Sequence, residues 1–230
     1  QGPGDVSVSI GTSGVCAMFS DSRPGDASGA VTGFADATGR FLPMATTINA
    51  SRILEAGRAL LGVDHEELSR LALASVPGAN GVTLLPYFDG ERTPNRPTAR
   101  ATLTGMSTST TREDVARAYV EGLLCSLADG IAALEDRTGT TPEGITLIGG
   151  AARSQAIQQL APAIFGREVT IAPEGEYVAL GAARQAAWAL TGAQEPPVWQ
   201  ITGSRTVGAE ATPQVLEAYR ELKDRTENWG

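Results

Sequence analysis

The segment Ile145-Thr-Leu-Ile-Gly-Gly-Ala-Ala-Arg-Ser154 is the most informative stretch for the fold. Its first four residues are apolar or β-branched, which is typical of a buried strand, and paired glycines follow them. A helical pattern begins near residue 154, so the segment predicts a helix N-terminus at the carboxyl end of a strand. Phosphates and sugars commonly bind at such a place. On these residues alone, a plain strand-to-helix turn is an equally good interpretation.

The glycine pattern of this segment also argues against one large class of enzymes. Dinucleotide-binding domains carry G-x-G-x-x-G between the first strand and its helix, and the third glycine is missing here. Several strands without intervening helices precede the segment, which is unlike a strand–helix–strand unit. A nicotinamide-dependent oxidoreductase is therefore disfavoured.

A second glycine turn, Gly11-Thr-Ser-Gly14, separates two strand-like runs at 6–10 and 15–19. Glycines at both ends let the backbone turn tightly and bring its N–H groups close to a ligand. The hydroxyls of Thr12 and Ser13 can donate to phosphate oxygens. An ordinary hairpin with polar turn residues is the commoner interpretation of such a short turn.

Outward from these turns, the chain changes from strands to alternating strands and helices. Residues 6–45 predict an antiparallel meander. We expect helices at about 49–61, 64–75, 111–138, 154–165, 176–190 and 212–228, and later strands at 82–85, 145–148 and 169–171. The loop at 86–104 is long enough to suggest a function. This order predicts one α/β domain with a mixed sheet, parallel in its second half.

Composition excludes several kinds of function. The net charge of −8 without a Lys/Arg block argues against nucleic-acid binding, and no apolar run is long enough to span a membrane. The single histidine, His65, is too few for a zinc site or a Ser-His-Asp triad. Cys16 and Cys125 lie in apolar stretches, and we expect two buried thiols in a reducing cytoplasm.

Two further segments carry weaker signals. In Gly90-Glu-Arg-Thr-Pro94, Arg92 has the planar fork that grips a phosphate or carboxylate, although a surface pair with Glu91 is commoner. Small residues in Val178-Ala-Leu-Gly-Ala-Ala183 let a helix press close to another element, so packing is the favoured interpretation there.

Taken in order, these segments resemble the C-terminal domain of the FGGY carbohydrate kinases, and most of all the xylulose kinases within that family. The resemblance runs from residue 5 to about 190, and Gly90–Pro94 is its most specific part. The segments that carry it are 9–14, 85–94, 105–106, 111–118, 121–122, 147–154 and 179–183. It implies a ribonuclease-H-like (actin-like ATPase) fold, a mixed sheet with helices on both faces. Two such domains would face each other across a cleft.

The resemblance also implies which residues bind ATP. Gly11, Thr12 and Ser13 match the family's loop at the terminal phosphates of the nucleotide. The segment beside the ribose and α-phosphate is matched by Gly149, Gly150 and Ala151. Ser154 matches a position near the adenine where relatives often carry Asn, so a side-chain contact to the base is in doubt.

The implied reaction is phosphorylation of a ketopentose by ATP with Mg²⁺, most simply D-xylulose to D-xylulose 5-phosphate. The family's catalytic Asp lies well before the Gly-Thr-Ser-Gly turn, hence upstream of Gln1, so no catalytic residue is expected in this chain. The chain lacks an initial Met and enters a strand pattern by its sixth residue. We therefore expect the C-terminal, nucleotide-binding half of a two-domain cytoplasmic kinase, inactive without its N-terminal sugar-binding domain. Residues 191–230 would form an extension with a surface helix.

Two alternatives remain open at this point. One is another FGGY kinase, acting on glycerol, gluconate, ribulose or fuculose. The other is a non-catalytic actin-like module that binds nucleotide as a switch or only mediates assembly. In that case the helix at 111–138 would serve a subunit interface, such as that of a homodimer.

Overall fold

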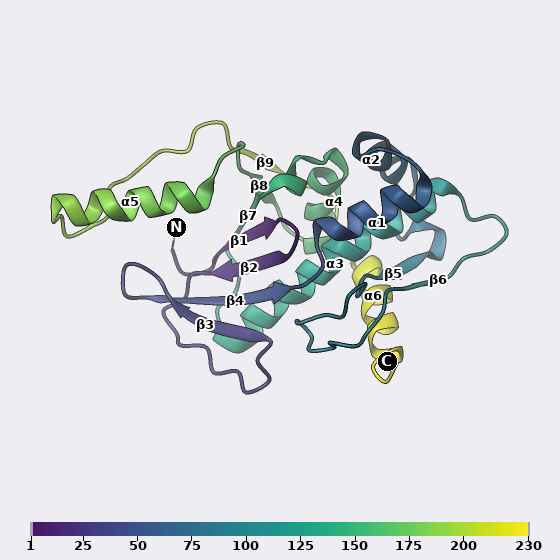
Figure 1. Ribbon diagram of the computed structural model, residues 1–230, viewed down its shortest axis with the longest axis horizontal. Coiled ribbons are helices and arrows are strands. Elements are labelled where there is room, and N and C mark those ends of the chain that lie inside the picture. Colours follow the sequence, from purple (N-terminus) through teal and green to yellow (C-terminus); the bar gives the residue numbers. More distant parts are fainter. Residues whose placement is uncertain (1, 230) are drawn as a thin grey trace.

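The computed structural model describes residues 2–229 and is built around a seven-stranded sheet with the order β3-β4-β2-β1-β7-β8-β9 (Figure 1). The strands are β1 Asp5–Ile10, β2 Gly14–Met18, β3 Val31–Ala35, β4 Phe41–Thr47, β7 Gly144–Ile148, β8 Val169–Ile171 and β9 Arg205–Val207. A separate antiparallel hairpin is formed by β5 (Thr83–Leu85) and β6 (Thr102–Thr104). The helices are α1 Ser51–Leu61, α2 His65–Ala74, α3 Arg112–Thr138, α4 Gln155–Phe165, α5 Tyr177–Thr191 and α6 Pro213–Arg225.

Strand β1 is the centre of the sheet and joins its two halves. It pairs antiparallel with β2 and parallel with β7, and β7 in turn pairs parallel with β8. The mixed α/β fold and the parallel pairing in the second half are thus confirmed. Because β1 and β7 are parallel neighbours, their carboxyl ends meet at one edge of the sheet, and both glycine turns follow at that edge.

The prediction of a simple meander over residues 6–45 is wrong in its strand order. Strand β4 lies between β2 and β3, so β3 is the edge strand and does not follow β2 in space. The chain leaves β2 through the long loop at 19–30 and returns through the tight β3–β4 turn at 36–40. Strand periodicity gives the existence of these strands but carries no information on which of them are neighbours.

Helix α3 forms the middle of the core. Eighteen of its 27 residues are buried, because it packs on β2 and β4 on one side and against α1, α2, α4 and α6 on others. Burial on nearly all sides is typical of a central helix. As Figure 1 shows, α3 runs behind α1 and across the sheet. The sequence left open whether the helix at 111–138 serves the core or a subunit interface. In the structure it forms part of the core.

Local signals set the helix ends close to where the sequence places them. Thr111, not Ser109, caps α3 in a capping box with Asp114, and Gly62 ends α1 in the left-handed conformation. Strand β6 lies inside the segment expected to be a loop at 86–104, and β9 was not predicted. Both have three residues, too few for a period to show.

The two faces of the sheet are covered unequally. The inward side chains of β1 (Val6, Val8 and Ile10) are buried, whereas Ser7 and Ser9 on the opposite face are only half-buried. Helix α5 extends to one end of the molecule (Figure 1) and has no buried residue. Over residues 2–229, no helix combines the length and apolarity needed to cross a membrane.

Candidate functional site

A cavity of about 890 Å³ lies where the two glycine turns meet helices α1 and α2. Its walls come from the end of β1 and the turn after it, from the segment after β7, and from the facing sides of α1 and α2. The lining residues include Ile10, Gly11, Thr12, Ser51, Leu54, Glu55, His65, Leu68, Ser69, Arg70, Leu73, Val120, Gly150, Ala151, Arg153, Ser154 and Gln155. Its volume is within the range of small-molecule sites, and apolar and polar side chains are mixed along its walls.

Glycine is required after β7 because the backbone there presses against β1. Gly149 has a φ of +95°, and a Cβ on it would lie 2.8–2.9 Å from backbone atoms of Ile10. The next residue, Gly150, faces the other way: a Cβ there would meet nothing within 4 Å. A side chain at residue 150 would project into the cavity, so the glycine keeps the backbone accessible to a ligand.

The turn at 11–13 is hydrogen-bonded to the segment between β4 and α1 and to the first residue of α1. The amides of Ala50 and Ser51 donate to the carbonyls of Thr12 (3.2 Å) and Gly11 (2.9 Å). Ser13 Oγ donates to the carbonyl of Ile48, 3.4 Å away. Among the hydrogen bonds of residues 2–229, none uses the amides of Thr12 and Ser13, which remain as donors for a ligand.

The N-terminus of α4 is capped by a residue from another helix. Ser154 is its N-cap residue but makes no side-chain cap; instead Ser69 Oγ of α2 accepts the Ala156 amide at 2.9 Å. The hydroxyl of Ser154 is only 3.4 Å from Ser69 Oγ. Because the Ser154 hydroxyl donates to Ser69 Oγ, its oxygen remains as an acceptor at the cavity wall, next to the positive end of the helix dipole.

Several charged side chains around the cavity form ion pairs. Arg70 binds Glu67 at 2.6–2.7 Å, and Arg153 binds Glu174. His65 Nε2 lies 2.7 Å from Glu55 Oε1, which joins α1 to α2 across the cavity edge. Ion pairing lowers the pKa of Glu55, mainly through the hydrogen bond from Arg58. The described residues contain no group of three His, Cys, Asp or Glu side chains placed to hold a metal.

Most residues that the sequence assigned to a nucleotide meet here. Gly11, Thr12, Gly150, Ala151 and Ser154 line the cavity; Ser13 and Gly149 belong to the same turns but do not line it. The sequence did not identify the contributions of Ser51, Ser69, Leu54 and Leu68, whose helical periodicity reads as ordinary core packing.

Arg92 lies elsewhere. Its side chain is exposed, and its Nη2 donates to Thr32 Oγ1 of β3 at 3.3 Å. The expected surface pair with Glu91 is not what the structure shows. Glu91 is buried and accepts the backbone amide of Arg92 (2.8 Å), because its carboxylate turns inward to Ile48 and Asn49.

Glycine turns at the carboxyl ends of adjacent parallel strands, opening on one large cavity, are typical of nucleotide-binding α/β domains. The chain belongs to the FGGY family of carbohydrate kinases: residues 6–190 match the model of the family's C-terminal domain.

Known proteins agree with this assignment. Xylulose kinase of Streptomyces rubiginosus is 42% identical over 190 residues, which are 83% of this chain and 38% of that protein. Xylulose kinase of Haemophilus influenzae is 34% identical over 81% of this chain and 38% of its own length. The crystal structure of xylulose kinase from Bifidobacterium adolescentis is 57% identical with a TM-score of 0.89, covering 97% of this chain and 44% of that one. The chain thus spans less than half the length of these relatives.

Proposed function

We propose that this chain is the ATP-binding half of a kinase that transfers the γ-phosphoryl group of ATP to D-xylulose, giving D-xylulose 5-phosphate. The observation that carries the proposal is the single cavity onto which both glycine turns open. The xylulose kinases among its relatives support the choice of sugar.

The residues of the cavity fit a nucleotide in three respects. The free amides of Thr12 and Ser13, with the Thr12 hydroxyl, form a donor set for terminal phosphates. Gly150 and Ala151 offer accessible backbone beside the N-terminus of α4, which suits a ribose and an α-phosphate. Leu54, Leu68 and Leu73 supply apolar wall for a base, and Ser154 offers a hydroxyl in place of the family's usual Asn.

Mg²⁺ enters the proposal as the companion of the nucleotide. It would neutralise charge on the transferring phosphoryl group, and such ions are commonly held by substrate phosphates with only one or two protein carboxylates. The chain's own contribution is therefore to position the phosphates through the turn at 11–13, rather than to build a cage of acidic ligands.

The other half of the protein would supply the catalytic Asp and most contacts to the sugar. Helix α5 supports a docking surface for it. Val178 and Leu190 are each 88% exposed, and a Cβ on Gly181 would meet nothing within 4 Å. An apolar helix that is left uncovered in this chain suits a second domain of the same protein. The isolated chain would bind nucleotide but transfer no phosphate.

Thermal unfolding with MgADP or MgATP tests the nucleotide site, with NAD as the control. A ligand at about a hundredfold its dissociation constant adds roughly 2.7 kcal/mol to the folded state, which raises the midpoint by roughly 5–10 °C. We expect a shift with ADP and ATP but not with NAD. No shift for the chain and none for the full-length protein would refute the site; a shift only for the full-length protein would mean that both domains are needed.

A substrate panel on the full-length protein tests the sugar. We expect the highest kcat/KM for D-xylulose among xylulose, ribulose, fuculose, gluconate and glycerol. A higher value for another member of the panel would reassign the substrate without touching the nucleotide site. Phosphate transfer by the isolated chain would contradict the proposed location of the catalytic Asp.

A further inference from the structure

We propose that the C-terminal helix α6 positions the turn at 11–13 through a relay formed by Arg96, Glu91 and the segment at 48–51. Arg96 and Glu91 would then be positioning residues for phosphate binding, although neither lines the cavity. This inference rests on the proposed function, since it assigns the turn to the terminal phosphates of a nucleotide. Helix α6 lies outside the residues matched by the family model, which end at 190.

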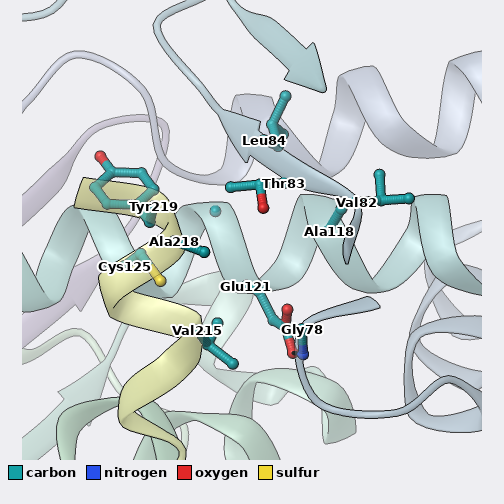
Figure 2. A pocket seen from close by; sticks show the side chains of 11 residues that line it. Gly78, Val82, Thr83, Leu84, Ala118, Glu121, Cys125, Val215, Ala218 and Tyr219 are labelled. Atoms are coloured by element: carbon teal, nitrogen blue, oxygen red, sulfur yellow. Dashed lines mark hydrogen bonds between the residues drawn. The ribbon is translucent and has the colours of Figure 1, made fainter. Parts of the chain in front are cut away.

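The first link is the docking of α6 on the domain. Val215, Tyr219 and Leu222 are buried against β5, α3 and α4. Asp129 of α3 accepts from both Arg220 (2.7 Å) and Lys223, which fixes the helix along its length. Figure 2 shows Val215, Ala218 and Tyr219 of α6 facing Cys125 of α3 and Thr83 of β5 across a small cavity. The helix is therefore a firmly attached element rather than a loose tail.

The second link is Arg96, which joins α6 to the loop at 86–104. Its Nη2 donates to the carbonyl of Lys223 (2.8 Å), and its Nη1 to Thr226 Oγ1 (3.3 Å). The guanidinium carbon lies 5.8 Å from the ring centre of the buried Tyr87, whose hydroxyl is 3.4 Å from that of Tyr219. One side chain thus reaches the last turn of α6 and a buried aromatic at the base of the loop.

The third link is Glu91, which is bonded to Arg96 through the backbone and to the sheet through its side chain. The amide of each residue donates to the carbonyl of the other at 2.8 Å. Glu91 is 1% exposed, and its carboxylate accepts the amide of Ile48 (2.6 Å) and Asn49 Nδ2 (3.1 Å).

Asn49 makes this link specific. Its Nδ2 also donates to the carbonyl of Gly90 (2.8 Å), while its Oδ1 is buried without a partner among residues 2–229. Leaving a buried acceptor unsatisfied is unfavourable. The two hydrogen bonds that Nδ2 donates to the loop hold the amide group in this orientation nevertheless. Residues 48–51 in turn carry Gly11, Thr12 and Ser13 through the three hydrogen bonds described above. A single contiguous chain of polar contacts therefore runs from α6 to the phosphate-binding turn.

The test compares Arg96→Met with Arg100→Met in the 230-residue chain. Arg100 is a matched control, because it lies in the same loop and, among the partners within residues 2–229, its Nη1 donates to the nearby carbonyls of Thr98 (3.1 Å) and Ala99 (3.0 Å) and to no distant element. We expect Arg96→Met to speed exchange of the hydrogen-bonded amides of the turn and its support by about tenfold, with residues 155–165 unchanged; these amides belong to Gly11, Gly14, Ile48, Ala50 and Ser51. Arg100→Met should leave both regions unchanged.

Nucleotide affinity provides the second readout. Arg96→Met should raise the dissociation constant of MgADP by about fivefold to tenfold. It should leave that of AMP unchanged, since AMP lacks the β-phosphate that would reach the turn. Arg96→Lys keeps the charge but not the planar fork, so it should restore the affinity in part; it also serves if the Met variant does not fold.

Two results would overturn the relay. One is faster exchange confined to 86–104 and α6; the other is an equal loss of ADP and AMP binding, which marks general destabilisation. If the unsubstituted chain binds no MgADP, the affinity comparison is made in the full-length protein, and absence of binding there as well refutes the proposed function. Exchange at Gly11 and Gly14 in the chain decides the relay in either case.

Discussion

Helices α3 and α5 lie in opposite surroundings. Both carry small residues among apolar ones, yet α3 has eighteen buried residues and α5 has none. The glycines show the difference most directly. A Cβ on Gly122 of α3 would lie 2.7 Å from the carbonyl oxygen of Leu84, whereas one on Gly181 of α5 would meet nothing. The same sequence pattern therefore marks a packed core helix in one place and an uncovered surface in the other.

The largest expected effect separates these two glycines. Gly122→Ala forces the Leu84 backbone away, and we expect a loss of about 2–3 kcal/mol in the free energy of unfolding. Gly181→Ala meets no atom and should stabilise the chain by roughly 0.5–1 kcal/mol, because alanine favours helix. Urea unfolding of both variants measures this. Similar losses for the two would show that α5 packs against the domain in solution.

The N-termini of α3 and α5 should differ in how their contribution to the free energy of unfolding depends on pH. Burial opposes ionisation of Asp114, but hydrogen bonds from Ser75, Thr111 and Asn80 outweigh it and lower its pKa from 3.8 to about 2. Since the folded-state pKa is depressed, the ionised group stabilises the fold above pH 4, and this stability is lost as the pH falls towards 2.

We therefore expect Asp114→Asn to cost about 2 kcal/mol at pH 7, and the gap to the unsubstituted chain to narrow below pH 4. Glu176, at the N-cap of α5, makes no side-chain cap, so Glu176→Gln serves as the matched control and should change little. Urea unfolding between pH 7 and pH 3 follows both. A gap that stays constant over this range would remove Asp114 ionisation as the source of the stability.

How far the sequence predicts each region follows from where its interactions lie. The ends of α1 and α3 follow from local signals such as Thr111 and Gly62, and the glycine turns identify the cavity. The position of β4 beside β2, the capping of α4 by Ser69 and the inward turn of Glu91 all depend on residues distant in sequence. No periodicity encodes such contacts. The expected pair of Arg92 with Glu91 was wrong for the same reason: a charged loop residue gives no sign of which neighbour it faces.

A smaller effect tests whether α5 has its partner in the rest of the protein. Val178→Ser and Leu190→Ser should change the stability of this chain by less than about 0.5 kcal/mol, because both side chains are already exposed. In the full-length protein each should cost about 1–2 kcal/mol if a second domain covers the helix at that residue. Parallel unfolding experiments on the two lengths provide the measurement. No loss at full length would mean that the face stays open and that the second domain docks elsewhere.

The smallest effect concerns α6, which is intermediate between α3 and α5 because one side of it is buried and the other exposed. The cavity beneath it measures about 20 Å³, roughly the space of one methyl group or one water molecule. It is lined mainly by apolar atoms, so Val215→Ile should fill it and stabilise the chain by about 0.5 kcal/mol.

Glu121 also lines this cavity and bears on the opposite result, a loss of stability on Val215→Ile. Burial raises its pKa, and the interactions that oppose this rise come from Arg117 (2.6 Å) and the Gly78 amide (3.1 Å), both bonded to one oxygen, Oε1. If Val215→Ile destabilises the chain, either the added methyl group overpacks the space or it displaces a water that solvates this carboxylate. A neutral Val215→Ala would contradict both versions, because it would show that α6 draws no stability from this contact and cannot anchor Arg96.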